Sequence, residues 1–123
     1  MVKYKCYKWK PFDKEFLLMK FDKPYSFLSR IFEGNETSDY IIEIIEGVKK
    51  TKNLQLDDYG FGNQSGFQAI ALKPDPADPT LPNGGVDIYD MHGNDENAIL
   101  TISLDEMLEI LESFKKFVTE NRK

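Results

Sequence analysis

The chain has 123 residues, of which 41% are hydrophobic and 13% aromatic, and its net charge is −5. This length and apolar content suit one domain with a core of its own, which excludes wholesale disorder and predicts a single domain over residues 1–123. No window approaches the roughly 18 apolar residues of a membrane span, the N-terminus lacks the pattern of a secretory signal, and one cysteine excludes an internal disulfide, so we expect a cytoplasmic protein.

Two strands are expected at the N-terminus. Residues 2–9 alternate lysines with apolar residues, which is typical of an edge strand with one wet face. The apolar run of residues 16–21 is expected to pair with this strand across residues 12–15. The pattern therefore predicts a hairpin at the start of the fold.

Two helices are expected next. Asp22 followed by Pro24 is typical of a helix start, and residues 25–32 form a short amphipathic segment that ends at Gly34. Residues 37–52 begin with capping residues, carry acidic residues early and lysines late, and repeat apolar residues at helical spacing. The isoleucines near the start of this segment would also suit a strand, because β-branched residues favour extended backbone.

The second half of the chain is expected to be rich in strands. The predicted strands are residues 54–59, 67–72, 85–91 and 97–103. A glycine-rich connection separates the first two strands, and a loop with four prolines, residues 74–85, follows the second. A short polar segment, residues 92–96, is expected to be the turn between the last two strands.

The last segment is expected to be an amphipathic helix. Ser103 and Glu106 have the spacing of a capping box, which satisfies backbone N–H groups at a helix start. The apolar stripe consists of Leu104, Met107, Leu108, Leu111, Phe114 and Val118. The fold class is therefore α+β, with a mostly antiparallel sheet of about five or six strands packed by two or three helices, the last of them the C-terminal amphipathic helix.

The only histidine lies in the segment DMHGNDEN, among acidic residues that could form a metal or catalytic site. Asp90, His92 and Asp95 offer mixed oxygen and nitrogen ligands. The flanking segments have the pattern of strands, however, and Gly93 and Asn94 tolerate the positive φ of a tight turn. We therefore interpret the segment as a hairpin turn and expect no metal and no cofactor.

Other catalytic arrangements have little support in the sequence. Asp57 and Asp58 are neighbours on a predicted strand and should point to opposite faces, and Asp87 and Asp90 also differ in parity. Neither pair is therefore expected to form an acid–base dyad. Cys6 lies among lysines that can lower a thiol pKa, but no motif places a base beside it. We therefore expect a protein that is not an enzyme.

Binding of phosphate groups is also disfavoured. The glycines of residues 60–66 precede a predicted strand, whereas a phosphate loop requires a helix N-terminus at that point. Residues 3–10 interleave lysines with tyrosine and tryptophan, a pattern that can bind single-stranded nucleic acid. The acidic half of the chain would repel the same polymer, and lysines have a separate role on an edge strand. We expect neither nucleic acid nor a membrane as a partner.

Charge is distributed unevenly along the chain. Residues 1–23 contain seven lysines and three acidic residues, whereas residues 74–114 contain ten acidic residues and neither lysine nor arginine. A long segment of one sign produces a field that can steer a basic partner. A solvated surface that keeps the protein soluble would explain the same composition.

The order of elements resembles the small immunity proteins of bacterial polymorphic-toxin and contact-dependent growth inhibition systems. The segments that carry the resemblance are PYSFLSRIFEG after the first strand pair, YGFGNQSGFQAIAL before the acidic strands, and VDIYDMHGNDENAILTISLDEMLEILESFKKFV at the end. The resemblance covers most of the chain. It implies a non-catalytic cytoplasmic protein whose partner is a cognate toxin C-terminal domain, often a nuclease, which the protein binds and blocks.

An immunity protein with this charge distribution would be expected to bind its toxin through the acidic half, with aromatic side chains as anchors. The residues expected to contact the toxin are Asp57, Asp58, Tyr59, Phe61, Asp75, Asp78, Asp87, Tyr89, Asp90, Asp95 and Glu96. Two alternatives stay open. One is a small adaptor or regulatory binding module, and the other is a carboxylate- and histidine-dependent hydrolase around Asp90 and His92.

Overall fold

The computed structural model describes residues 2–23, 25–26, 28–32, 38–62, 66–91 and 97–121. Within these ranges the strands are β1 (Tyr4–Trp9), β2 (Phe16–Phe21), β3 (Asp58–Gly62), β4 (Phe67–Leu72), β5 (Gly85–Asp90) and β6 (Leu100–Ile102). The helices are α1 (Leu28–Phe32), α2 (Ser38–Lys52) and α3 (Leu104–Asn121), and a 3₁₀ turn, η1 (Pro11–Asp13), joins the first two strands.

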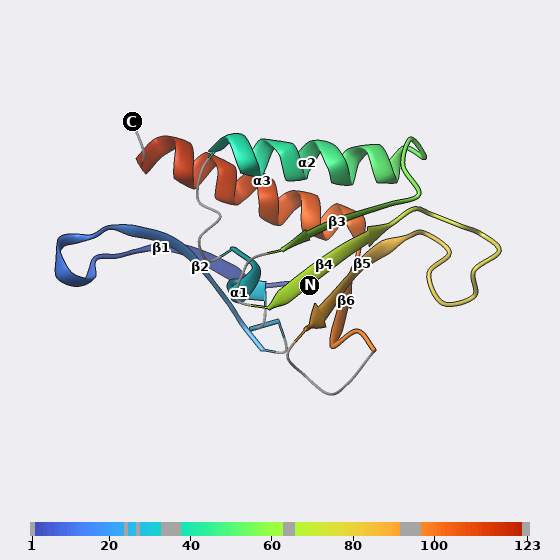
Figure 1. The fold of residues 1–123 in the computed structure, drawn as a ribbon, viewed down its shortest axis with the longest axis horizontal. Coiled ribbons are helices and arrows are strands. Elements are labelled where there is room, and N and C mark those ends of the chain that lie inside the picture. The colour runs from blue at the N-terminus through green and yellow to red at the C-terminus, as the bar shows by residue number, and fades with distance from the viewer. Residues whose placement is uncertain are drawn as a thin grey trace.

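The strands form two antiparallel sheets (Figure 1). β1 and β2 make a hairpin in which Cys6 lies opposite Met19, and the other four strands follow in the order β3-β4-β5-β6. The expected α+β class, the antiparallel pairing and the C-terminal helix are confirmed. The strands divide into two sheets rather than one because, among the described residues, the N-terminal hairpin pairs only with itself.

One apolar core connects the hairpin to the helices. α2 and α3 lie side by side on one face of the four-stranded sheet (Figure 1). The Phe32 ring on α1 lies 5.9 Å from the Phe21 ring of β2 and 5.5 Å from the Phe114 ring of α3, centroid to centroid. All three side chains are buried, so this aromatic cluster joins three elements that are far apart in the sequence.

The N-cap hydrogen bond expected from Ser103 at the start of α3 is confirmed. The backbone N–H of Glu106 donates to Ser103 Oγ at 3.0 Å, and the Glu106 carboxylate accepts from the backbone N–H of Val2 at 3.2 Å. Most of the expected stripe is buried, but Leu108 is only partly buried and Ile110, which the stripe omitted, lies in the core. The core face of the helix is therefore turned toward Ile110.

The third strand begins later than the sequence indicates. Residues 54–59 have the pattern of a strand, but the chain after α2 turns at Leu54, which has a positive φ of 65°, and β3 spans Asp58–Gly62. Two glycines that were expected in a connection therefore belong to the strand. A Cβ at Gly62 would lie 2.5 Å from the carbonyl oxygen of Phe67, so close approach of β4 requires glycine there.

The expected pairing of the last two strands is confirmed, since Val86 lies opposite Ile102 and Ile88 opposite Leu100. The turn predicted at residues 92–96, which contains the only histidine, lies outside the described residues. The proline-rich connection is confirmed between β4 and β5, where the chain leaves the sheet and returns (Figure 1).

Candidate interaction surface

The four-stranded sheet has an inner face toward the helices and an outer face. Residues that lie opposite each other in an antiparallel register share a face. The inner residues are buried, and they are Phe61, Ala69, Ala71, Val86, Ile88 and Ile102. The outer residues include Asp58, Gly60, Gly62, Gln68, Ile70, Leu72, Asp87, Tyr89 and Thr101. α2 and α3 both lie on the inner side (Figure 1), so neither covers the outer face.

In the second half of β4, the alanines face the inner side and the larger Ile70 and Leu72 face the outer side. Ala69 and Ala71 have no exposed surface beneath the helices, whereas Ile70 and Leu72 lie on the outer face and are partly exposed. On a sheet with one wet face, the outer positions are normally polar. Two bulky apolar side chains at the centre of the sheet therefore mark this face as a candidate contact surface.

Acidic side chains flank this apolar centre on the neighbouring strands. Asp58 on β3 lies opposite Leu72, and Asp87 on β5 lies opposite Ile70. The Thr101 hydroxyl on β6 donates to Asp87 Oδ1 at 2.6 Å. This hydrogen bond fixes the orientation of the Asp87 carboxylate at the surface, which lowers the entropic cost of its contact with a cation.

Tyr89 is the aromatic residue of this face. It lies opposite Gln68, and its hydroxyl is 3.5 Å from Asp87 Oδ2. Burial, followed by the negative charge of Asp87, raises the pKa of Tyr89, so the phenol stays neutral at physiological pH. We refer to the set Asp58, Ile70, Leu72, Asp87 and Tyr89 as the acidic sheet face.

Three further acidic residues of the expected surface lie at or beyond the end of this sheet. The Lys73 ammonium donates to Asp57 Oδ1 at 2.7 Å, and this bond and the lysine charge lower the pKa of Asp57. The Thr80 hydroxyl donates to Asp78 Oδ1 at 2.6 Å, which lowers the pKa of Asp78. Asp75 accepts a backbone N–H in the same loop. Lys73 offsets part of the negative charge that Asp57 would offer to a partner.

Tyr59 and Phe61, which were expected as aromatic anchors, point to the inner side of the sheet. Phe61 is 3% exposed, and the Tyr59 ring lies against the backbone of Gly47 on α2. Burial, followed by the charge of Glu43, raises the pKa of Tyr59. Both side chains therefore serve the packing of α2 rather than an outer contact surface, because they lie opposite the buried Ala71 and Ala69 on the inner face.

The remaining expected contact residues do not join the acidic sheet face. Asp90 lies opposite Phe67 and has the parity of the inner residues, so it and Asp87 point to different sides, as their spacing predicts. Asp95 and Glu96 lie outside the described residues. Of the expected set, the structure thus brings together Asp58, Asp87 and Tyr89.

The apolar members of the face were missed by the sequence analysis. Their signal is the strand FQAIAL, in which alanine alternates with isoleucine and leucine. An all-apolar strand does not by itself reveal which of its two faces meets the helices. Only the burial of both alanines shows that Ile70 and Leu72 lie on the outer side.

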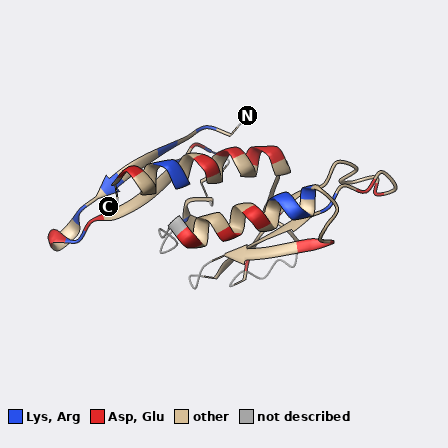
Figure 2. Cartoon of the chain, turned by 90° about the horizontal axis from the view of Figure 1, so that it is seen from above, with Lys and Arg blue, Asp and Glu red and all other residues tan. Residues whose placement is uncertain are grey.

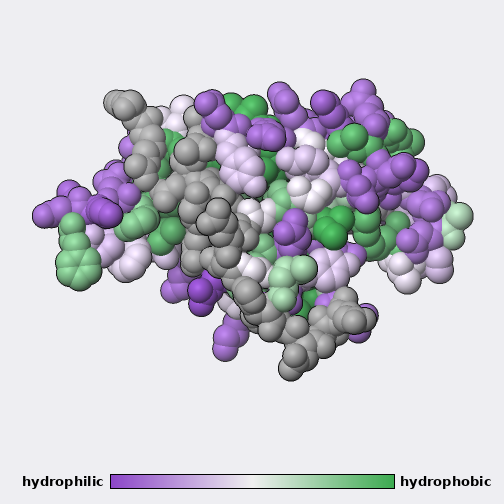
Figure 3. Space-filling view, in the orientation of Figure 1, coloured by the Kyte–Doolittle hydropathy of each residue, from purple (hydrophilic) through white to green (hydrophobic). Residues whose placement is uncertain are grey.

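Basic and acidic residues lie in different parts of the folded molecule. Figure 2 shows lysines along the β1–β2 hairpin and at the end of α2, and acidic residues along α3 and at the start of β3. The hairpin projects from the rest of the molecule, and Figure 3 shows hydrophobic surface beside hydrophilic residues at its free end. The chain therefore has a basic, partly apolar end and an acidic sheet.

Metal-ligating side chains do not form a cluster in the described part of the chain. It contains no group of three His, Cys, Asp or Glu side chains that could hold a metal ion. Cys6 is partly buried in the hairpin, and burial raises the pKa of its thiol. A raised pKa disfavours the thiolate form that a nucleophile requires.

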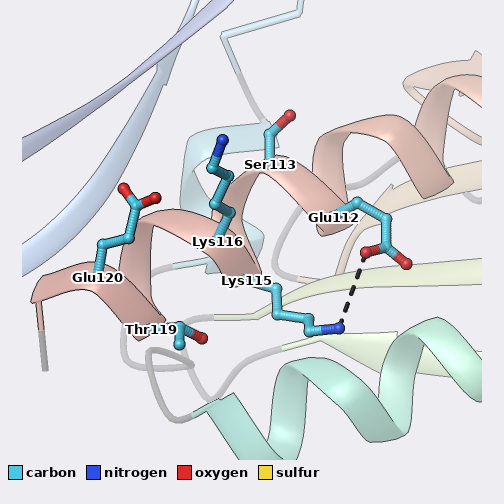
Figure 4. Close-up of a pocket in the computed structure, with 6 residues that line it drawn as sticks. All are labelled: Glu112, Ser113, Lys115, Lys116, Thr119 and Glu120. Carbon is cyan, nitrogen blue, oxygen red and sulfur yellow. Dashed lines mark ion pairs between the residues drawn. The ribbon is translucent and has the colours of Figure 1, made fainter. Parts of the chain in front are cut away.

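Two open grooves follow α3. The larger has a volume of about 530 Å³ and is lined by Glu112, Ser113, Lys115, Lys116, Thr119 and Glu120 (Figure 4). Figure 4 shows Ser113, Lys116 and Glu120 pointing to one side of the helix, while Glu112 and Lys115 form an ion pair of 3.9 Å on another. The smaller groove, of about 300 Å³, lies between the N-terminal residues and the first half of α3. The residues that line the larger groove are all polar or charged, and all of them come from α3.

No helix among the described residues has the length and apolar character needed to cross a membrane. No family model matches the chain, and no curated protein or solved structure is similar to it to a significant degree.

Proposed function

We propose that the protein is a non-catalytic cytoplasmic binding protein that neutralises a cognate toxin domain through the acidic sheet face. The observation that carries this proposal is the outward position of Ile70 and Leu72 next to two carboxylates, Asp58 and Asp87. A contact surface between proteins commonly has an apolar centre and a charged or polar rim. A surface that serves solubility alone has no need of the two apolar residues.

The sign of the charge indicates the chemistry of the partner. Carboxylates around an apolar centre fit a basic protein surface that also carries apolar side chains. Nucleases have such surfaces because they bind the phosphate backbone through lysine and arginine, and we therefore expect a nuclease toxin. The negative field would speed association with this partner, and Tyr89 is the side chain best suited to be an anchor at the centre of the contact.

The proposal is tested by co-purification with the toxin domain encoded beside the gene. The tagged toxin domain is expressed together with the chain, and we expect the wild type to be retained in a stable complex. The outer-face variant Ile70→Ser/Leu72→Ser should lose the complex, whereas Leu54→Ser, at a position that is 66% exposed outside the face, should keep it. Circular dichroism checks that both variants are folded.

Two outcomes would overturn the proposal. One is the absence of any complex with the wild-type chain, which would favour an adaptor with a different partner. The other is a complex that survives the outer-face variant while the Leu54→Ser control behaves like the wild type. In that case the toxin would bind elsewhere on the molecule.

The hydrolase alternative makes a different prediction. If residues around Asp90 and His92 performed chemistry, His92→Ala and Asp90→Asn would abolish protection of cells that express the toxin. We expect both variants to protect as well as the wild type, because the proposed contact surface includes neither residue. Loss of protection in both variants, with the fold intact, would favour the hydrolase.

A further inference from the structure

The β1–β2 hairpin has an outer face of its own. On the side toward the core, Leu17, Met19 and Phe21 are buried. The residues of the other parity form the basic hairpin face, which consists of Lys5, Tyr7, Trp9, Phe16, Leu18 and Lys20. The hairpin packs against α1 and α3 with its core side. No described element contributes a third strand to its sheet. Within the described residues, the basic hairpin face is the second sheet surface that no helix covers.

This face exposes aromatic side chains to an unusual degree. Trp9 is 53% exposed and Tyr7 36% exposed, and the Trp9 and Phe16 rings are in contact with centroids 5.6 Å apart. Phe12, in the turn between the strands, is fully exposed at 100%. A cluster of large apolar side chains on a projecting hairpin marks a contact surface, because such side chains are normally buried.

The two lysines of the face repel each other. Lys5 lies directly opposite Lys20 in the strand register. Like charges at directly opposed positions destabilise a hairpin, and an edge strand needs only scattered lysines for protection against aggregation. A negatively charged partner on this face would turn that repulsion into attraction.

The molecule itself carries a surface with the matching properties. The acidic sheet face has an apolar centre of Ile70 and Leu72 and negative charges at Asp58 and Asp87, whereas the hairpin has an aromatic centre and positive charges. Two sheets stack face to face when their side chains interdigitate at a separation of about 10 Å. We infer that the basic hairpin face of one copy of the chain docks on the acidic sheet face of a second copy.

A second copy fits this surface better than a nucleic acid or an anionic membrane. The tip of the hairpin carries Asp13 between its lysines, and Glu106 and Glu109 line the groove that begins beside Val2 and Tyr4. These carboxylates would repel a polyanion that extends past the hairpin face. The acidic sheet face of a second copy offers its apolar centre to the aromatic rings and its two carboxylates to the two lysines.

This inference rests on the acidic sheet face that the proposed function assigns to the toxin. The same face cannot hold a hairpin and a toxin together, so the toxin would displace the second copy. The contact joins two different surfaces, and it therefore yields either a closed dimer with both contacts or a longer head-to-tail assembly. Self-association would cover the acidic sheet face until a toxin arrives.

Sedimentation velocity of the purified chain without toxin tests the inference. We expect a mass above the 14.2 kDa of the monomer that grows with protein concentration and decreases as salt is raised. Trp9 is the only tryptophan of the chain, so its fluorescence should shift to shorter wavelength as the assembly forms. Lys5→Glu/Lys20→Glu and Asp58→Lys/Asp87→Lys should each weaken self-association at least about tenfold.

The decisive variant combines all four substitutions, because it exchanges the charges of both faces. We expect it to recover self-association, whereas the control Lys23→Glu/Lys50→Glu, which changes exposed lysines outside the face, should behave like the wild type. A wild-type chain that stays monomeric at every concentration would overturn the inference. So would self-association that is unchanged in both charge-reversal variants, or binding of monomeric chain to anionic vesicles or oligonucleotides that depends on Lys5 and Lys20.

Binding of the toxin domain is measured separately from self-association. If the wild type is monomeric but Asp58→Lys/Asp87→Lys still abolishes toxin binding, self-association is wrong and the proposed function stands. If the chain self-associates as described but toxin neither binds nor disperses the assembly, the two faces are an interface between copies alone and the proposed function is wrong.

Discussion

The Tyr59 ring on β3 occupies the space that a side chain at Gly47 on α2 would need. A Cβ at Gly47 would lie 2.5 Å from the nearest atoms of the ring, which is far below a normal contact. A glycine within a helix usually destabilises it by about 1 kcal/mol relative to alanine. The close approach of helix and strand explains why glycine is present here, and it keeps Tyr59 on the inner side of the sheet.

We predict that Gly47→Ala lowers the free energy of unfolding by about 1–3 kcal/mol, because overpacking outweighs the gain in helix propensity. Urea denaturation measures this change. In a Tyr59→Ala background, where the ring is absent, the same substitution should instead be neutral or stabilising. A stabilising effect of Gly47→Ala in the wild-type background would show that α2 and β3 are not in close contact.

The aromatic cluster predicts a large effect at the centre of the core. Phe114 has no exposed surface and contacts Phe32, so Phe114→Ala should cost about 3–5 kcal/mol of unfolding free energy. Leu108→Ala on the same helix is the matched control and should cost less than about 2 kcal/mol, because Leu108 is only partly buried. Equal costs at the two positions in chemical denaturation would contradict the orientation of α3.

The thiol of Cys6 should react slowly. Burial raises its pKa, so the thiolate fraction at pH 8 is smaller than in an unfolded chain. We expect alkylation by iodoacetamide to be slower for the folded protein than for the protein in urea, and to accelerate as the pH rises above 9. A folded protein that reacts faster than the unfolded one would indicate an activated cysteine and would favour a catalytic role for Cys6.

Local signals in the sequence predicted the elements that depend on neighbouring residues. The hairpin of β1 and β2 was read from alternation, and the start of α3 from Ser103 and Glu106. The end of β3 was not predicted, because glycines such as Gly62 are typical of turns, and only the contact with Phe67 on the next strand explains the place of Gly62 in a sheet. Information of this kind lies in long-range packing.

Long-range packing also limited the prediction of the candidate surface. Asp58, Asp87 and Tyr89 were predicted as contact residues from charge and residue type. Tyr59 and Phe61 were assigned to the surface because they are aromatic residues among acidic ones, and the sequence does not show which face of their strand meets the helices. The outward position of Ile70 depends on the helices that cover the alanines beside it, and no local pattern encodes that choice.

The most direct test of the proposed function is the affinity of the purified chain for its cognate toxin domain, measured by calorimetry with Asp58→Lys/Asp87→Lys. We predict that this variant loses about 2–5 kcal/mol of binding free energy. Its unfolding free energy should change by no more than about 1 kcal/mol per residue, because exposed carboxylates contribute little to stability. The control Glu46→Lys, an exposed position on α2, should bind like the wild type. Wild-type affinity in Asp58→Lys/Asp87→Lys, or an equal loss in the Glu46→Lys control, would contradict the assignment of the acidic sheet face to the toxin.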